Sequence, residues 1–219
     1  KLSAGDIVPQ VLCGELWLRR HDLGPVSNLV LMGMGEPFAN YEQVCQALRV
    51  LNAEAGLNIG QRRITVSTCG LAPQIRRFAD EGWEINLAIS LHAPQDELRS
   101  RLLPVNQRYP LAELLAACDY YTEKTHRRIS YEYALLRGVN DGPEQAAALA
   151  QLLAGRLAHV NLIPVNFVAE TGFWPSNDET LNQFAAALQR QGIETTVREK
   201  RGLDIDGACG QLRRRQGES

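Results

Sequence analysis

Short apolar runs alternate with stretches of helical spacing along most of the chain. Strand-like apolar runs predict strands at 28–33, 63–67, 85–90, 129–136 and 160–165, and a stretch rich in Thr and Val predicts another at 193–198. Between these runs, apolar residues recur three and four positions apart, which predicts amphipathic helices: Val44, Ala47, Leu48 and Leu51, then Ile75, Phe78 and Ala79, then Leu111, Leu114, Leu115 and Cys118, then Ala146, Leu149, Leu152 and Leu153, and finally Leu181, Phe184 and Leu188. This repeated strand–helix–strand order implies a parallel sheet with right-handed crossovers.

Helix-end signals agree with these patterns. Residues typical of first turns and helix ends flank them: Asn40, Pro73, Pro110, Pro143 and Gly192. Ser3 and Asp6 have the spacing of a capping box and predict a first helix at about 4–20. Pro9 should bend that helix or delay its start, because proline lacks the N–H that a helix interior needs.

The order of elements favours an α/β fold built as a barrel-like arc over a doubly wound sheet, because the crossovers show no obvious reversal. The chain opens on a helix with no strand before it, whereas a βα barrel usually begins with a strand. Either the fold is an open arc or its beginning is missing. We expect a truncated N-terminus and an absent first strand.

Composition restricts the function classes. The chain has 219 residues, a net charge of -2 and a pI near 6.1, so its overall field does not indicate a nucleic-acid binder. Local basic clusters could converge on phosphates, although each alone is typical of a solvated helix end or tail. They are Arg19–Arg20, Arg62–Arg63, Arg127–Arg128, 198–201 and 213–215. No apolar run approaches the ~18 residues of a membrane span, so no membrane association is expected.

The five cysteines are widely scattered, at positions 13, 45, 69, 118 and 209. An odd, scattered set fits free thiols in a reducing compartment, and predicts a cytoplasmic protein. No two of them lie at metal-site spacing, so we assign no metal ligand within this chain.

The first candidate site follows the apolar run at 29–31. Gly33 and Gly35 would let a ligand approach the backbone closely, and Glu36 adds a carboxylate before the stiff Pro37. Ligands of parallel α/β folds bind at the carboxyl ends of strands. The combination suits a ligand with a cationic amino group, such as an amino acid. The alternative is a glycine-rich turn with a solvated glutamate.

Other predicted strands also end in small or polar groups. They are Ser67-Thr68-Cys69-Gly70, Ser90-Leu91-His92-Ala93-Pro94 and Pro164-Val165-Asn166-Phe167. Together with Glu36, these groups could hold a zwitterionic ligand that carries a ribose. Each has a structural alternative: Ser67 and Ser90 could cap helices, His92 could be a structural hydrogen-bonding residue, and Asn166 could form an Asx turn.

Cys209 is the second unusual position, because it lies between the small residues Ala208 and Gly210. An accessible thiol is a nucleophile only as thiolate. Asp204 and Asp206 would disfavour the thiolate unless they pair with Lys200 or Arg201 in the same stretch. The alternative is an inert cysteine in a flexible tail.

These motifs occur in the same order in one family. The chain resembles the radical S-adenosylmethionine RNA methyltransferases of the RlmN and Cfr type, and RlmN more closely, over residues 1–212, with a basic tail at 213–219. The resemblance implies a partial (βα)6 TIM-like barrel that holds S-adenosylmethionine (AdoMet) and a [4Fe-4S] cluster. It places Gly35 and Glu36 at the methionine amino group, and assigns the methylated cysteine to Cys209. The remaining ligand contacts that it implies are Ser67, Ser90, Leu91, His92 and Asn166.

The reaction that the resemblance implies is methylation of an adenine in 23S rRNA, with tRNA as a second candidate substrate. Carbon 2 of adenine is not nucleophilic, so the methyl group passes first to Cys209 and then to the base by a radical route that needs an external electron donor. Carbon 8 stays open as the target, because the two types of relative share these motifs.

The chain departs from the family at one point: the CxxxCxxC cluster motif is absent. We therefore expect a C-terminal fragment that is inactive by itself. Two other functions stay open: a cluster-free module that binds AdoMet or RNA, and an unrelated metabolic barrel enzyme with Glu36 as acid/base and His92 as proton shuttle.

Overall fold

A computed structural model describes residues 1–32, 35–165 and 172–198. Its strands form one sheet in the order β1-β2-β3-β4-β5-β6, and every neighbouring pair is parallel. The strands are β1 Leu29–Leu31, β2 Ile64–Thr68, β3 Asn86–Ser90, β4 Ile129–Leu135, β5 Ala158–Pro164 and β6 Glu194–Val197. All the predicted strands are present, although β1 is shorter than 28–33 and β5 begins before residue 160. Because consecutive strands are neighbours without reversal, the predicted arc is confirmed.

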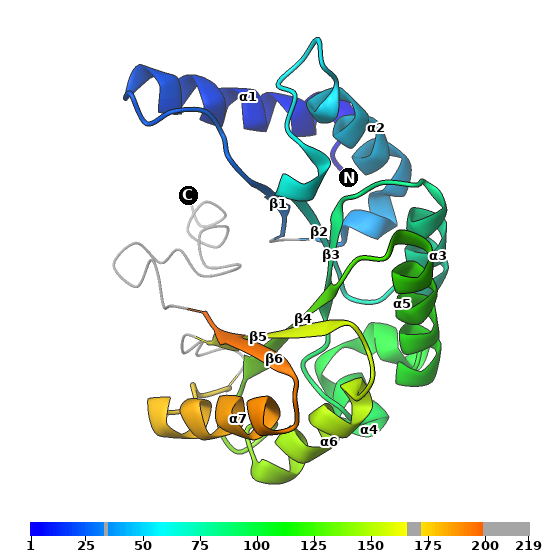
Figure 1. Cartoon of the computed structure of the whole chain (residues 1–219), viewed down its shortest axis with the longest axis vertical. Coiled ribbons are helices and arrows are strands. Elements are labelled where there is room, and N and C mark those ends of the chain that lie inside the picture. The colour runs from blue at the N-terminus through cyan, green and yellow to red at the C-terminus, as the bar shows by residue number, and fades with distance from the viewer. Residues whose placement is uncertain (33–34, 166–171, 199–219) are drawn as a thin grey trace.

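The sheet is curved, and the helices lie on its convex side (Figure 1). The helices are α1 Ala4–Arg20, α2 Tyr41–Asn52, α3 Ala72–Asp80, α4 Asp96–Leu102, α5 Leu111–Thr125, α6 Pro143–Leu153 and α7 Asp178–Arg190. Short 3-10 turns lie at Pro37–Asn40, Gln61–Arg63 and Pro104–Gln107. The sequence patterns missed α4, because a short polar helix carries no apolar period.

The helix expected at about 4–20 is confirmed, and Asn40 directly precedes α2, but two details differ from expectation. Helix α1 begins at Ala4 despite Pro9, because the N–H and hydroxyl of Ser3 donate to the Asp6 carboxylate at 2.8 and 2.7 Å and fix the first turn. The expected delay is therefore wrong. Asn40 precedes α2, but its side chain donates to the carbonyl of Leu2 at 2.6 Å instead of capping the helix.

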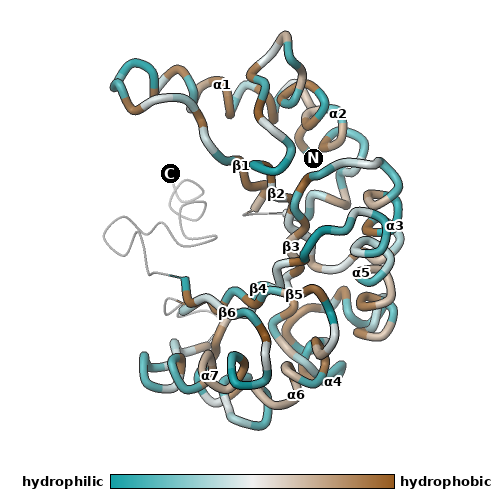
Figure 2. Tube along the Cα trace, viewed as in Figure 1, coloured by the Kyte–Doolittle hydropathy of each residue, from teal (hydrophilic) through white to brown (hydrophobic). Residues whose placement is uncertain are grey.

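Side chains alternate across the sheet, as the pleat requires. Apolar residues of the strands pack in the main core under the helices: Ile64, Val66, Leu87, Ile89, Tyr131, Tyr133, Val160 and Leu162. Their neighbours along each strand face the concave side and are mostly polar: Thr65, Ser67, Asn86, Ser90, Ser130, Glu132, His159 and Asn161. Figure 2 shows apolar and hydrophilic residues alternating along the helices. No helix in the described part of the chain is long and apolar enough to span a bilayer.

Candidate functional site

Glu36 connects the turn after β1 to the end of β2. Its Oε1 accepts the Phe38 N–H at 2.9 Å, and its Oε2 accepts the Cys69 N–H at 2.7 Å. Gly35 has φ +109°, in the region that residues with a Cβ rarely adopt, and this turn aims Glu36 toward β2. The structure therefore brings together Glu36 and the Ser67–Gly70 stretch, as the sequence predicted.

Ser67 and Ser90 lie near the carboxyl ends of β2 and β3, on the concave side, and are half-buried. Neither caps a helix, because α3 follows Leu71 and α4 follows Gln95. The capping alternative is therefore wrong.

Leu91 is placed differently from the hydroxyl-bearing serines. Its side chain is fully buried in the core. Its N–H donates to the Glu132 carbonyl at 3.0 Å, and its carbonyl accepts from Arg99 Nε at 3.1 Å. The side chain of Leu91 therefore belongs to the core and does not face the concave side.

His92 is held as a neutral acceptor at the end of β3. Its Nδ1 accepts the Ala134 N–H at 3.0 Å, which places the ring proton on Nε2. Burial lowers the pKa of His92 to about 4, and the nearby charge of Arg99 acts in the same direction. The fully buried Asn140 donates to the carbonyls of His92 and Ala134 at 2.8 and 2.7 Å, and so ties β3 to β4. The arrangement leaves Nε2–H as the donor that His92 can offer.

Arg99 is the positioning residue that sequence reasoning missed. Its guanidinium donates to the carbonyls of Cys69 at 2.7 Å, Ser90 at 3.0 Å and Leu91 at 3.1 Å, and to Asn106 Oδ1 at 2.8 Å. It is fully buried, and none of the ion pairs among the described residues includes it. Burial lowers the pKa of Arg99 to about 10, so the group still carries its charge at neutral pH. One side chain thereby fixes the ends of β2 and β3 against each other.

Two candidate residues, Asn166 and Cys209, lie outside the described residues. The stretch from Asp204 to Leu212 and the boundary between 212 and the basic tail also lie there. Their roles stay predictions.

The described residues do not fit an iron–sulfur cluster. No group of three His, Cys, Asp or Glu within residues 1–32, 35–165 and 172–198 could hold a metal ion. Burial raises the pKa of Cys45 to about 11 and that of Cys69 and Cys118 to about 12, which favours the neutral thiol over the ligating thiolate. The same residues do fit AdoMet, because a carboxylate, two hydroxyls and an imidazole N–H gather at one edge of the sheet.

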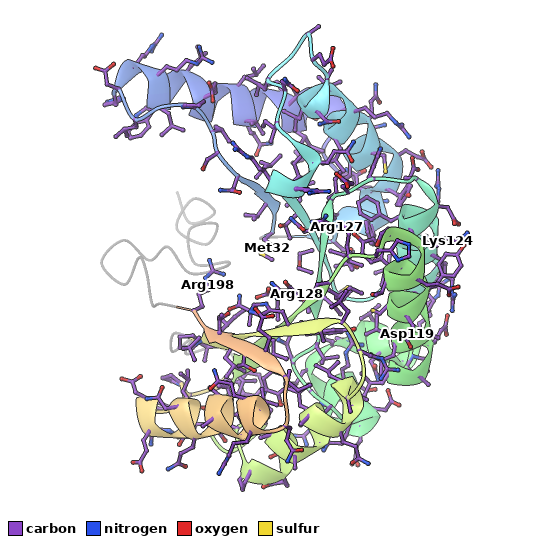
Figure 3. All side chains as sticks on the ribbon, in the orientation of Figure 1. Met32, Asp119, Lys124, Arg127, Arg128 and Arg198 are labelled. Carbon is purple, nitrogen blue, oxygen red and sulfur yellow. The ribbon has the colours of Figure 1, made fainter. Side chains whose placement is uncertain are left out.

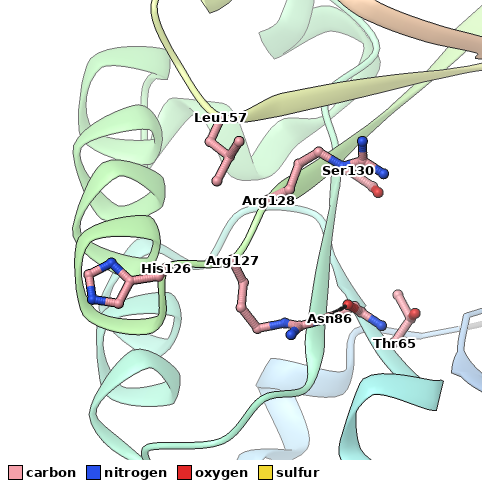
Figure 4. Close-up of a pocket in the computed structure, with 7 residues that line it drawn as sticks. All are labelled: Thr65, Asn86, His126, Arg127, Arg128, Ser130 and Leu157. Carbon is pink, nitrogen blue, oxygen red and sulfur yellow. Dashed lines mark hydrogen bonds between the residues drawn. The ribbon is translucent and has the colours of Figure 1, made fainter.

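A separate pocket of about 630 Å³ lies at the opposite, amino ends of β2, β3 and β4 (Figure 4). It is lined by Thr65, Asn86, His126, Arg127, Arg128, Ser130 and Leu157. Arg127 Nη2 donates to Asn86 Oδ1 at 2.5 Å, and Arg128 pairs with Glu194. Parallel α/β folds bind ligands at the other ends of their strands, so the pocket lies away from the candidate site.

Comparison with known proteins agrees with this architecture. Residues 15–150 match the model of the Radical SAM superfamily. A solved radical SAM methyltransferase from Sphaerobacter thermophilus superposes with a TM-score of 0.93 at 50% identity, covering 96% of this chain and 61% of that one. Streptococcus suis SuiB, solved with bound S-adenosylmethionine, shares only the fold, at 15% identity and a TM-score of 0.64. The chain belongs to the radical SAM superfamily, and its fold is the partial barrel of that class.

Within the superfamily, the chain is similar to RlmN-type proteins. A protein of Thermoanaerobacter sp. (strain X514) is 51% identical over 214 residues, which are 98% of this chain and 61% of the relative. A protein of Symbiobacterium thermophilum is 53% identical over 98% of this chain and 57% of the relative. Both carry the name "Probable dual-specificity RNA methyltransferase RlmN". The chain spans about 60% of the length of these relatives.

Replacing Arg99 with Met should destabilise the protein by about 3 kcal/mol or more, because the buried carbonyl of Leu91 and the part-buried carbonyls of Cys69 and Ser90 lose their donor. Urea unfolding measures this loss. The exposed Arg101 on the same helix is the control, and Arg101→Met should stay within about 0.5 kcal/mol of wild type. Equal effects of the two substitutions would contradict the role of Arg99.

The low pKa of His92 makes stability depend on pH. Unfolding returns His92 to a pKa near 6.5, so the unfolded chain binds more protons between pH 6.5 and about 4. The contribution of neutral His92 to the free energy of unfolding is complete above pH 6.5. It is lost as the pH falls to about 4, by up to roughly 3 kcal/mol.

His92→Asn is the matched variant, because Asn tolerates the φ of +57° and keeps an acceptor for Ala134 but does not titrate. The free energy of unfolding of His92→Asn should fall less between pH 6.5 and 4 than that of wild type. Parallel pH profiles would show that His92 is not held neutral.

Proposed function

We propose that the protein is a radical SAM RNA methyltransferase that acts on carbon 2 of an adenine in 23S rRNA, with tRNA as a second substrate. The observation that carries this proposal is the joining of Glu36 to the end of β2 through the Cys69 N–H, beside Ser67. Similarity to RlmN-type relatives over 98% of the chain supports the reaction class. Activity, substrates and an external electron donor are proposed for the intact protein, because this chain spans only part of those relatives.

The concave side offers groups that match the parts of AdoMet. Each Glu36 oxygen already accepts one N–H and keeps a further lone pair for the methionine ammonium. Ser67, Ser90 and the Nε2–H of His92 supply hydroxyls and a donor for the rest of the ligand. Gly35 and Asn166 complete the proposed contacts, and Leu91 contributes main-chain atoms. When bound, AdoMet supplies a methyl group and, on reductive cleavage, a 5′-deoxyadenosyl radical.

Cys209 is the proposed methyl carrier. Adenine carbon 2 is not nucleophilic, so it cannot take a methyl group from a sulfonium directly. A thiolate is nucleophilic and can accept the methyl group first. The role of this chain is therefore to place Cys209 and AdoMet near one base and to exclude water.

A metabolic enzyme that uses His92 as a proton shuttle is disfavoured, because His92 Nδ1 is occupied and its pKa is about 4. A cluster-free AdoMet- or RNA-binding module is the second candidate. The missing CxxxCxxC motif favours it for these 219 residues by themselves. AdoMet binding by the 219-residue chain without iron would support that module.

Glu36→Ala in the intact, iron-loaded protein should weaken AdoMet binding about tenfold or more, because the ammonium loses its charged acceptor. Calorimetry gives the dissociation constants. The exposed Glu42 on α2 is the control, and Glu42→Ala should bind AdoMet like wild type. Unchanged affinity of Glu36→Ala would refute the proposed contact.

Cys209→Ala should abolish methyl transfer to 23S rRNA and leave AdoMet cleavage in place, because only the methyl carrier is lost. Mass spectrometry of the RNA measures transfer, and the modified base identifies carbon 2 or carbon 8. The exposed Cys13 is the control, and Cys13→Ala should stay active. A purified, active enzyme without methyl on Cys209 would count against the mechanism.

A further inference from the structure

The pocket at the amino ends of β2, β3 and β4, called here the amino-end pocket, has no part in the proposed function. Its lining residues are Thr65, Asn86, His126, Arg127, Arg128, Ser130 and Leu157. Its volume of about 630 Å³ falls in the range of sites for small organic ligands. None of the described residues that line it is acidic, whereas two are arginines. The cavity therefore favours an anionic ligand over a cationic one.

Two of the basic pairs in the sequence meet at this end of the sheet. Arg62 and Arg63 directly precede β2, and Arg127 and Arg128 directly precede β4. The carbonyl of Arg62 accepts from Asn86 of the pocket at 2.8 Å. The sequence left open whether basic clusters converge, and these two pairs do, because the parallel strands that follow them begin at one edge of the sheet.

Arg127 has more donors than partners. Its Nη2 donates to Asn86 Oδ1 at 2.5 Å, whereas its Nε is buried and has no hydrogen-bond partner among the described residues. None of the ion pairs in the described part of the chain includes Arg127. A guanidinium presents five N–H donors, and a buried donor without an acceptor is costly. Arg127 is therefore suited to an anionic acceptor supplied by a ligand.

The carboxylates near these arginines are bound by other groups or only weakly paired. Arg62 donates to both oxygens of Glu84, at 3.1 and 2.7 Å. These hydrogen bonds lower the pKa of the Glu84 carboxyl, and the more distant charge of Arg127 adds to the effect. Glu194 pairs with Arg128, but both side chains are exposed, and such pairs contribute little. Arg128 can therefore turn to a ligand at small cost.

Figure 3 shows Arg127 and Arg128 on the inner side of the molecule, whereas Asp119 of α5 lies on its outer side. Asp119 pairs there with Arg156 at 2.9 Å. The carboxylate of Asp119 therefore does not neutralise the two arginines of the pocket.

Two hydroxyls complete the donor set. Thr65 lies beside Asn86 in the strand register, and Ser130 follows Arg128 by two positions. In Figure 4, Arg127 points toward Asn86 and Thr65, and Arg128 points toward Ser130. Guanidinium groups combined with hydroxyls suit phosphate, because its oxygens accept several hydrogen bonds at once and match the guanidinium fork.

We infer that the amino-end pocket binds a phosphate group, with Arg127 as its main ligand and Thr65 and Ser130 as hydroxyl donors. The phosphate belongs either to a free phosphorylated molecule or to an RNA backbone. The described lining residues include no Phe, Tyr or Trp on which a base could stack, so the phosphate is the part recognised. The inference goes beyond the proposed function, because the pocket is separate from the proposed AdoMet contacts.

Calorimetric titration of the intact protein with inorganic phosphate, at constant ionic strength, tests this site. Arg127→Gln should weaken phosphate binding about tenfold or more, because the charged donors are lost while the amide can still donate to Asn86. Thr65→Val keeps the β-branched shape and the net charge, and should weaken binding about threefold through the lost hydroxyl. This second variant keeps the inference falsifiable if Arg127→Gln does not fold.

Arg190→Gln is the matched control. Arg190 is an exposed arginine in the last turn of α7, it does not line the pocket, and none of the ion pairs among the described residues includes it. The substitution removes the same charge and should leave phosphate affinity at the wild-type value. A wild type that binds no phosphate overturns the inference. Arg127→Gln and Thr65→Val variants that bind phosphate as tightly as Arg190→Gln also overturn it.

A second titration, with an RNA hairpin at increasing salt concentration, identifies the source of the phosphate. If the phosphate belongs to an RNA backbone, Arg127→Gln should weaken RNA binding and lower the slope of log affinity against log salt by about one. If Arg127→Gln weakens phosphate binding alone, the ligand is a free phosphorylated molecule, and the site still stands. Absent AdoMet binding would overturn the proposed function and leave the phosphate titration unaffected, so the two failures are distinguishable.

Discussion

The alternation of side chains along parallel strands is the constraint on which the rest of this structure depends. With the helices of the described residues on the convex side, every second strand residue must be apolar, and the others face the concave opening. Leu87 and Ile89 enter the core, while Asn86 and Ser90 face the opposite way. A barrel with helices all round its outside can therefore have a polar interior, and that interior is where a polar cofactor fits.

The strand ends also require donors that belong to neither strand. Where the regular hydrogen bonds of β2 and β3 stop, the carbonyls that follow are partly or fully buried and need partners. Arg99 supplies several of these donors from one side chain, and Asn140 does the same between β3 and β4. Glu36 provides the matching acceptor between the turns after β1 and β2. These polar side chains therefore connect the described loops of the candidate site to one another.

This arrangement gives several residues two tasks. Glu36 both accepts backbone N–H groups and faces the proposed ligand, and His92 accepts the Ala134 N–H while offering Nε2–H. A structural explanation and a binding explanation therefore do not exclude each other at these positions. Leu91 is the exception, because its side chain serves the core alone.

The sequence by itself predicted the strands, the parallel arc and the position of Glu36, Ser67, Ser90 and His92 at or beyond strand ends, because hydrophobic period and strand-end position are local properties of the chain. It could not reveal the roles of Arg99 or Asn140. These residue types are usually exposed, and the sequence does not show that contacts between separate strands and loops bury them here. It also left the state of His92 open, because the neutral, accepting imidazole follows from burial and from the Ala134 N–H of the next strand. Only tertiary structure decides such partners, because they come from residues up to 48 positions apart.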